Sequence, residues 1–275
     1  MEMKTRMYNA VHRGYCFSLP LLLVLLISGT PALAGTGAFF STTTFGAVDL
    51  ARFDSPSGPS TIIGPFGGVY TWDAMAFNPG GCLYAAGGEG NLIIINQETG
   101  ATQLMGNAGF GIDAMAFDPS GRLFGFSSTA SSTDAYEIDP QDASTSSVAN
   151  FDVSVNGLTY DTVTARFLAL STYGVLYEFD PDVPSLTLLG DLGVGQENYF
   201  TSIEADPGGS VYVMERAGHI HSLDVGLLTT VYLGQPVVFD VRSLVYGPSA
   251  SSPSAVEPTT LGRLKRLFGF LRMGD

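Results

Sequence analysis

Residues 114–124 read Ala-Met-Ala-Phe-Asp-Pro-Ser-Gly-Arg-Leu-Phe, an apolar run, a stretch of turn-forming residues and a second apolar run. Related segments recur along the chain, the last of them incomplete: residues 74–84, 157–167, 202–212 and 243–248. The residues equivalent to Phe117 follow one another at steps of 40, 43, 45 and 41 residues: Phe77, Phe117, Tyr160, Ala205 and Tyr246. Recurrence at this spacing indicates a protein built from structural repeats.

The centre of each segment predicts a tight turn between two antiparallel strands. In Asp118-Pro119-Ser120-Gly121, proline fixes φ for a turn, glycine adopts a positive φ, and the aspartate can accept hydrogen bonds from the turn backbone. The flanking runs contain aromatic and β-branched residues, which favour strands. Each segment therefore predicts a β-hairpin.

A second half-repeat lies between these hairpins. Its copies end at acidic or amide residues spaced by 41 to 44 residues: Asp54, Asn96, Asp139, Asp180 and Asp224. Each copy continues through a turn into a short apolar strand, so one unit holds four short strands, as a β-propeller blade does. One such sheet cannot bury both of its faces alone, and the units must therefore stack radially. The Gly and Pro residues leave no room for the helices of other repeats of this period.

The two ends of the repeat region complement each other. Residues 38–42 align with the second strand of a unit, so the first unit lacks its strand one. Residues 240–246 form a strand one with no further strand after it, and four complete units lie between. We therefore predict an all-β fold, a five-bladed propeller over residues 35–248 whose first blade is closed by a C-terminal strand. Such closure leaves no free sheet edge between the chain ends.

Composition limits the classes of function. The 275 residues are 45% hydrophobic and only 14% charged, so the chain has ample apolar surface for a core and is not expected to be disordered. The predicted propeller holds 5 Arg, no Lys and 23 acidic residues, a net charge of −18. Nucleic-acid binding requires clustered Lys and Arg, so this balance argues against such a partner.

The N-terminus has the pattern of a secretory signal peptide. Lys4, Arg6 and Arg13 precede the apolar run 17–27, and Ala32 and Ala34 occupy the small-residue positions of a cleavage site. The alternative, a membrane anchor, needs a run of about 20 apolar residues, roughly twice the length present. We predict cleavage after Ala34, giving a secreted, cell-surface or periplasmic protein with no transmembrane segment.

The last 27 residues differ from the repeats. Residues 249–258 form a Ser/Pro-rich linker, and residues 259–275 predict a short basic helix with one apolar stripe. The stretch 256–265, Val-Glu-Pro-Thr-Thr-Leu-Gly-Arg-Leu-Lys, resembles C-terminal sorting tails of exported bacterial proteins, with Leu261 where those tails carry Trp. That resemblance implies a sorting or attachment tag. A helix packed on the propeller and a frayed end are the alternatives.

The blades themselves resemble those of secreted bacterial β-propellers. The resemblance rests on residues 117–124 and on Leu-Tyr-Glu-Phe-Asp-Pro at 176–181, followed by Leu-Leu-Gly at 188–190, and it covers residues 38–248. The quinoprotein-like and lactonase-like superfamilies are among these proteins. The resemblance implies the fold, whereas lyases, lactonases, dehydrogenases and plain binding modules all share such blades.

Three sets of residues are candidates for a site. Aromatic residues fall in inter-blade loops just before the predicted inner strands and would suit a sugar or peptide ligand: Tyr70, Trp72, Phe110, Tyr199 and Phe200. The alternative is that they pin adjacent blades together.

The second set consists of oxygen ligands for a cation. Glu204 replaces the small Ala76 and Ala116 of other blades, and Asn156 and Asp113 lie just before inner strands. Lactonase-like propellers bind calcium through carboxylates and Asn facing the axis, so the resemblance implies a Ca²⁺ site here. These acids could instead serve solubility.

A histidine pair is a third candidate. His219 and His221 point the same way on a strand and could share a metal with a carboxylate such as Glu204 or Glu215. Their positions are also ordinary strand positions in other blades.

Two functions remain open on the sequence. The first is a monomeric, non-enzymatic exported propeller without a cofactor that binds a protein, a glycan or a surface component and is held by its tail. The second is a lactonase-like or lyase-like enzyme with an axial cation. The chain has no nucleophile elbow, no phosphate-binding Gly-x-x-x-x-Gly-Lys loop and no Cys-x-x-Cys motif, and we favour the first function.

Overall fold

The computed structural model describes residues 37–43, 49–65, 72–193, 199–236 and 241–248. The predicted signal peptide (1–34), the linker (249–258) and the tail helix (259–275) lie outside the described residues. The described residues form strands and turns, and none of them belongs to a helix long and apolar enough to cross a membrane.

Twenty strands form five antiparallel sheets of four, which we call blades 1 to 5. Blade 1 comprises, from the axis outward, β20 (Val241–Pro248), β1 (Gly37–Thr43), β2 (Asp49–Phe53) and β3 (Thr61–Pro65). Blade 2 comprises β4 (Trp72–Phe77), β5 (Leu83–Gly87), β6 (Asn91–Ile95) and β7 (Thr102–Asn107). Blade 3 comprises β8 (Ala114–Phe117), β9 (Leu123–Ser128), β10 (Thr133–Ile138) and β11 (Thr145–Phe151). Blade 4 comprises β12 (Gly157–Asp161), β13 (Arg166–Leu170), β14 (Val175–Asp180) and β15 (Ser185–Asp191). Blade 5 comprises β16 (Phe200–Ala205), β17 (Val211–Glu215), β18 (Ile220–Asp224) and β19 (Thr229–Gly234).

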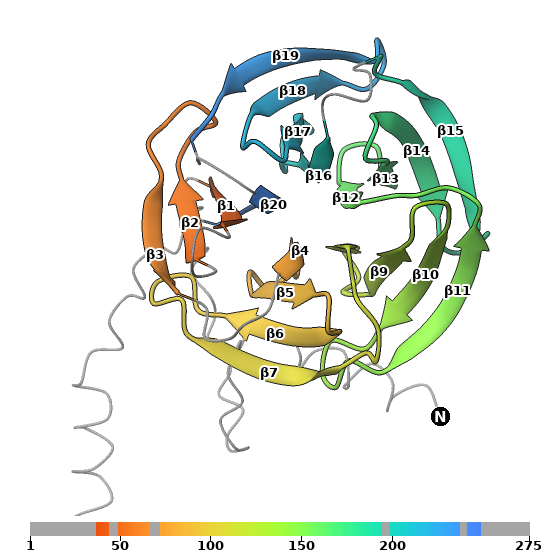
Figure 1. Ribbon diagram of the computed structural model, residues 1–275, viewed down its shortest axis with the longest axis horizontal. Helices are drawn as coiled ribbons and strands as arrows, with labels where there is room; N and C mark the ends of the chain where they lie inside the picture. Colours follow the sequence, from red (N-terminus) through yellow and green to blue (C-terminus); the bar gives the residue numbers. More distant parts are fainter. Residues whose placement is uncertain (1–36, 44–48, 66–71, 194–198, 237–240, 249–275) are drawn as a thin grey trace, which may run out of the picture.

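The blades are arranged around one axis as a closed ring (Figure 1). The inner strands β20, β4, β8, β12 and β16 surround the axis, and each contacts the inner strand of the next blade. The outer strands β3, β7, β11, β15 and β19 form the rim of the ring. The predicted five-bladed propeller of four-stranded blades is therefore confirmed.

The ring closes inside blade 1, as the complementary fragments at the two chain ends predict. β20 pairs antiparallel with β1, with Phe39 opposite Tyr246 and Gly37 opposite Pro248. The buried hydroxyl of Ser41 donates to the carbonyl oxygen of Ser243 at 2.8 Å. A strand from the far end of the chain thus covers the edge that β1 would otherwise expose.

The Asp-Pro-x-Gly segments form the predicted turns. Gly81, Gly121 and Gly209 have φ of 81°, 93° and 84°, values at which a side chain would be strained. Asp206 accepts hydrogen bonds from the backbone N–H groups of Gly208 and Ser210 at 2.8 and 2.9 Å. The turn residues therefore set the hairpins that define each blade.

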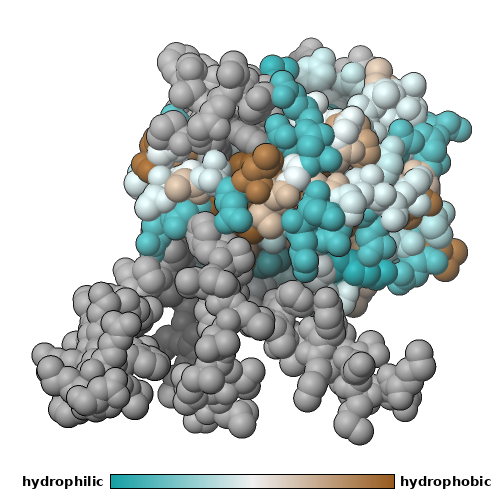
Figure 2. Space-filling view, turned by 90° about the horizontal axis from the view of Figure 1, so that it is seen from below, coloured by the Kyte–Doolittle hydropathy of each residue, from teal (hydrophilic) through white to brown (hydrophobic). Residues whose placement is uncertain are grey.

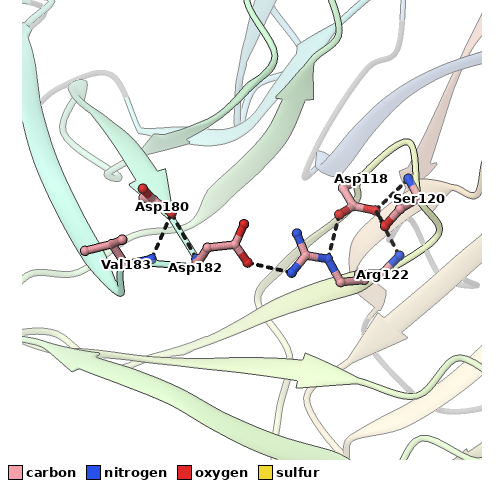
Figure 3. Close-up of polar contacts among 6 residues, drawn as sticks. All are labelled: Asp118, Ser120, Arg122, Asp180, Asp182 and Val183. Carbon is pink, nitrogen blue, oxygen red and sulfur yellow. Dashed lines mark hydrogen bonds and ion pairs between the residues drawn. The ribbon is translucent and has the colours of Figure 1, made fainter.

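Figure 3 shows how the turn between β8 and β9 of blade 3 is joined to blade 4. Asp118 accepts hydrogen bonds from the backbone of Ser120 and Arg122, and its Oδ2 lies 2.8 Å from Arg122 Nε. Burial alone would raise the pKa of Asp118, but the hydrogen bonds from Ser120 and Arg122 hold it below its ordinary value. Arg122 Nη1 also lies 2.7 Å from Oδ1 of Asp182, in the turn that Asp180 caps between β14 and β15. One guanidinium therefore bridges two blades.

The core lies between the blades. Phe179 of β14 is 1% exposed and packs edge-on or tilted against rings of blades 3 and 4, with centroid distances of 5.0 to 6.2 Å: Phe124, Phe126, Phe151 and Phe167. Residues on the outer strands are mostly exposed or half-buried. The described residues coloured in Figure 2 are mainly hydrophilic or neutral, with scattered hydrophobic atoms. Blade-to-blade packing therefore supplies most of the apolar burial.

Candidate functional site

A cavity of about 520 Å³ lies where the inner strands end. Its wall includes all five residues equivalent to Phe117, of which four are aromatic and one is small: Phe77, Phe117, Tyr160, Tyr246 and Ala205. The prolines of the turns also line it: Pro79, Pro119, Pro207 and Pro248. Small residues one position earlier, Ala76 and Ala116, leave the space open. The cavity is therefore apolar and nearly fivefold in its lining.

The aromatic rings of this wall are held in place by packing behind them. Tyr160 packs edge-on against Phe167 at 4.8 Å, and Tyr246 against Phe39 at 4.9 Å. A Cβ atom at Gly247 would lie 2.1 Å from the ring of Phe77. The aromatic part of the wall therefore lies on strands and is preformed, and ligand sites are usually preformed.

Glu204 is the acidic side chain that breaks the fivefold pattern. Its Oε1 accepts a hydrogen bond from the backbone N–H of Tyr246 on β20 at 3.1 Å. Its Oε2 accepts one from the hydroxyl of Thr159 on β12 at 3.3 Å, and that hydroxyl in turn accepts from Ala205 N–H. Glu204 thus joins three inner strands while lining the cavity.

Burial raises the pKa of Glu204 to about 8, although the hydrogen bonds from Tyr246 and Thr159 act in the opposite direction. The folded protein therefore holds this proton at neutral pH, whereas in the unfolded chain a glutamate ionises near pH 4.3, about its unperturbed value. Between these two pKa values the folded state binds more protons than the unfolded state, so stability decreases as the pH rises.

We expect the melting temperature of the native protein to fall between pH 5 and pH 8, the window that these pKa values define. Glu204→Gln keeps an acceptor for Tyr246 N–H and cannot ionise, so its melting temperature should fall less over the same range. Differential scanning fluorimetry at several pH values measures both. Parallel curves for the two proteins would contradict the assignment.

The predicted aromatic residues lie elsewhere. Phe200 is 2% exposed and packs in the core between blades 4 and 5, and Phe110 stacks on Tyr136 at 4.2 Å. Tyr199 is 46% exposed and lies 5.8 Å from Tyr173. Trp72 is the first residue of β4, and Tyr70 lies outside the described residues. Phe110 and Phe200 thus have packing partners, and neither they nor Tyr199 are among the residues that line the 520 Å³ cavity.

The predicted calcium ligands are divided between the two ends of the inner strands. Asp113 and Asn156 lie with Asp73 around a small cavity of about 10 Å³ at the strand starts, whereas Glu204 lines the large cavity at the strand ends. Burial and the charge of Asp73 raise the pKa of Asp113, while a hydrogen bond from Ser128 N–H at 2.7 Å lowers it. The structure therefore does not bring these three residues into one site.

The histidine pair meets a carboxylate. His219 Nδ1 lies 2.9 Å from Oε2 of Glu215, and His221 Nε2 lies 2.9 Å from Oε1. Both imidazoles also pack edge-on against Tyr232. In the described part of the chain, no group of three His, Cys, Asp or Glu side chains has an arrangement suited to a metal ion. We interpret the group as a polar network that fixes the β17–β18 hairpin.

The sequence did contain a signal for the cavity. The equivalents of Phe117 occupy one fixed position in each repeat unit, and four of them are aromatic. This recurrence marks that position as special in the sequence. At the position just before these equivalents, Glu204 carries an ionisable side chain, whereas Ala76, Ala116 and Thr159 do not.

No family model matches the chain, and no curated protein matches it significantly. A solved structure of a protein of unknown function from Bacteroides thetaiotaomicron is 13% identical, with a TM-score of 0.50, over 79% of this chain and 66% of that one. The chain thus spans slightly less than two thirds of that protein. A structure described as a "putative gluconolactonase" is also 13% identical, with a TM-score of 0.50, over 76% of this chain and 81% of that one. At this level of identity the likeness concerns the fold alone, and the chain is a five-bladed β-propeller.

Proposed function

We propose that this protein is an exported, non-enzymatic binding module whose ligand occupies the cavity at the ends of the inner strands. The observation that carries the proposal is the preformed cavity of about 520 Å³, which has an aromatic and proline wall and few polar groups. Ligand sites in proteins commonly combine this volume range with such a lining. A protein, a glycan or another surface component presents its binding group to this cavity.

Export and attachment complete the proposal. The pattern of residues 1–34 supports secretion to the cell surface or the periplasm, and the resemblance of residues 256–265 to sorting tails supports attachment by the C-terminus. A monomer is part of this proposal, since the ring is closed by β20 of the same chain and needs no strand from a second copy.

A lactonase-like enzyme with an axial cation is the second candidate. The observation that favours it is the convergence of Asp73, Asp113 and Asn156 at the starts of the inner strands, because calcium prefers such oxygen ligands. Arg242 Nη1, however, lies 3.3 Å from Asp73 Oδ1 and supplies positive charge where a cation would. We therefore favour the binding function over the catalytic one.

Filling the cavity tests the binding site. Ala205→Phe introduces a ring at the position where the other four blades carry one, so it should abolish ligand binding while the protein stays folded. Ala130→Phe, at an exposed turn, is the matched control. Ligand-observed NMR with a fragment library measures binding, and melting temperatures verify folding. Equal binding to Ala205→Phe, or an absence of fragments that bind the native protein, would remove the proposed site.

Deleting residues 250–275 tests the role of the tail. The fold should persist, because the last described strand, β20, ends at Pro248. Exported protein should move from the cell surface to the medium, and fractionation with immunoblotting measures this shift. The linker is too short for a deletion of the same length that spares residues 259–275. The control is therefore a protein whose 259–275 sequence is scrambled, which keeps the length and composition of that segment. An unchanged distribution would refute the attachment role.

A further inference from the structure

The charge of the cavity lining is unbalanced. Two of the described lining residues carry carboxyl groups, Asp118 and Glu204, and none of the described lining residues is Lys, Arg or His. Asp118 is paired with Arg122 at 2.8 Å. In the described part of the chain, Glu204 has no cationic side chain within ion-pair distance, so it is the acidic group in the cavity that lacks a counter-charge.

The hydrogen bonds to Glu204 leave acceptor capacity open. Each of its oxygens accepts one bond from the protein, from Tyr246 N–H and from the Thr159 hydroxyl. An ionised carboxylate offers about four acceptor positions, so two donors do not satisfy it. A cationic group placed beside it would compensate its charge, and one that also carries an N–H would donate a charge-assisted hydrogen bond, which is about twice as strong as a neutral one.

Aromatic residues flank this carboxyl group. Tyr246, whose N–H binds Glu204, and Tyr160, which follows Thr159, both line the cavity, as do Phe77 and Phe117. The face of an aromatic ring attracts cations, and rings arranged around a cavity bind quaternary ammonium groups. The same electrostatic field repels carboxylates, sulfates and phosphates.

We propose that the cavity binds an alkylammonium group, with its nitrogen next to Glu204 and its alkyl substituents against Tyr160, Tyr246, Phe77 and Phe117. This inference rests on the proposed function, since it names the ligand class of the same cavity. A ligand protein could present the group as a lysine or methylated lysine side chain, and a small molecule as a quaternary amine.

Binding of a cation is coupled to the release of the proton on Glu204. Burial keeps Glu204 protonated at pH 7, with a pKa of about 8, and an adjacent cation favours the ionised form. Ligand binding therefore releases a proton, and affinity rises with pH until Glu204 is ionised. The titratable groups that face Glu204 are Asp206 on its own chain segment, Tyr212 on β17, Tyr160 on β12 and Tyr246 on β20. Glu204→Gln keeps all four of these groups.

The test compares choline with its neutral carbon isostere, 3,3-dimethylbutan-1-ol, on the mature full-length protein by titration NMR. Choline should bind the native protein at least about 10-fold more tightly than the isostere, the ratio that 1.4 kcal/mol corresponds to. Its affinity should rise by roughly 100-fold from pH 6 to pH 9, as the ionised fraction of a group with a pKa of about 8 does, whereas that of the isostere should stay constant. In Glu204→Gln the pH dependence should disappear and the preference for choline should fall to the part that the aromatic rings supply.

The outcomes separate the two proposals. Equal binding of both probes, choline binding that is unchanged in Glu204→Gln, or binding of neither probe would overturn the ammonium inference. A preference for choline that persists in Ala205→Phe would place its site elsewhere and overturn it as well. If other fragments still bind the native protein and not Ala205→Phe, the cavity remains the binding site and the ligand class alone is wrong. The pH series uses the native protein, so the test does not depend on the folding of a variant.

Discussion

Truncation after Gly234 is expected to abolish folding, whereas truncation after Ser249 should leave the melting temperature nearly unchanged. The first truncation removes β20, which supplies the buried Leu244 and Val245 to the core. It also removes the hydrogen bonds that Ser202 Oγ makes with the backbone of Leu244 at 3.1 and 3.2 Å. Blade 1 would lose its inner strand and blade 5 its neighbour, so the ring would open.

Thermal unfolding and size-exclusion chromatography of the two truncated proteins measure this effect. The protein that ends at Gly234 should aggregate or show no cooperative transition, because β1 would present an unpaired edge to other molecules. The protein that ends at Ser249 controls for the loss of the C-terminal segment. Equal melting temperatures for both would contradict closure by β20.

Phe179→Ala should destabilise the fold by about 3–5 kcal/mol, the usual cost of removing a large aromatic side chain from a core. Its ring lies between blades 3 and 4 and contacts Phe124 and Phe126 of blade 3 and Phe167 of blade 4. The cavity left by the ring could not close, because the strands of blades 3 and 4 hold the surrounding side chains in place. The loss acts on the interface between two blades rather than within one.

Urea denaturation of the native protein and the variant gives this free energy of unfolding. Tyr173→Ala is the matched control, since Tyr173 is 47% exposed and should change stability little. A loss below about 1 kcal/mol for Phe179→Ala, within the range of ordinary substitutions, would show that the blades pack independently of this ring.

The sequence allowed the fold to be predicted because each level of the pattern points to the same answer. The turn Asp118-Pro119-Ser120-Gly121 predicts a hairpin, and its recurrence predicts blades. The unpaired fragments 38–42 and 240–246 predict closure, and the register of β1 against β20 agrees with it. These signals are local, or depend on the repeat alone.

The cavity could not be predicted in the same way, because it depends on side chains from five blades meeting at one end of the axis. At the strand starts, the ion pair of Arg242 with Asp73 lies beside a cavity of only about 10 Å³. At the strand ends, Ala76 and Ala116 leave the space open. Glu204 binds Thr159 and Tyr246, which lie one repeat away on either side in the sequence. Their distance to Glu204 follows from the radius of the ring rather than from any local motif.

The pairing of Gly37 with Pro248 has a consequence for where a fusion partner can be attached. Both residues also line the cavity, so the two ends of the propeller lie beside the same mouth. A bulky fusion partner joined directly at Gly37 or Pro248 would crowd this mouth, whereas one inserted at the Thr129–Ser132 turn between β9 and β10 would leave it clear.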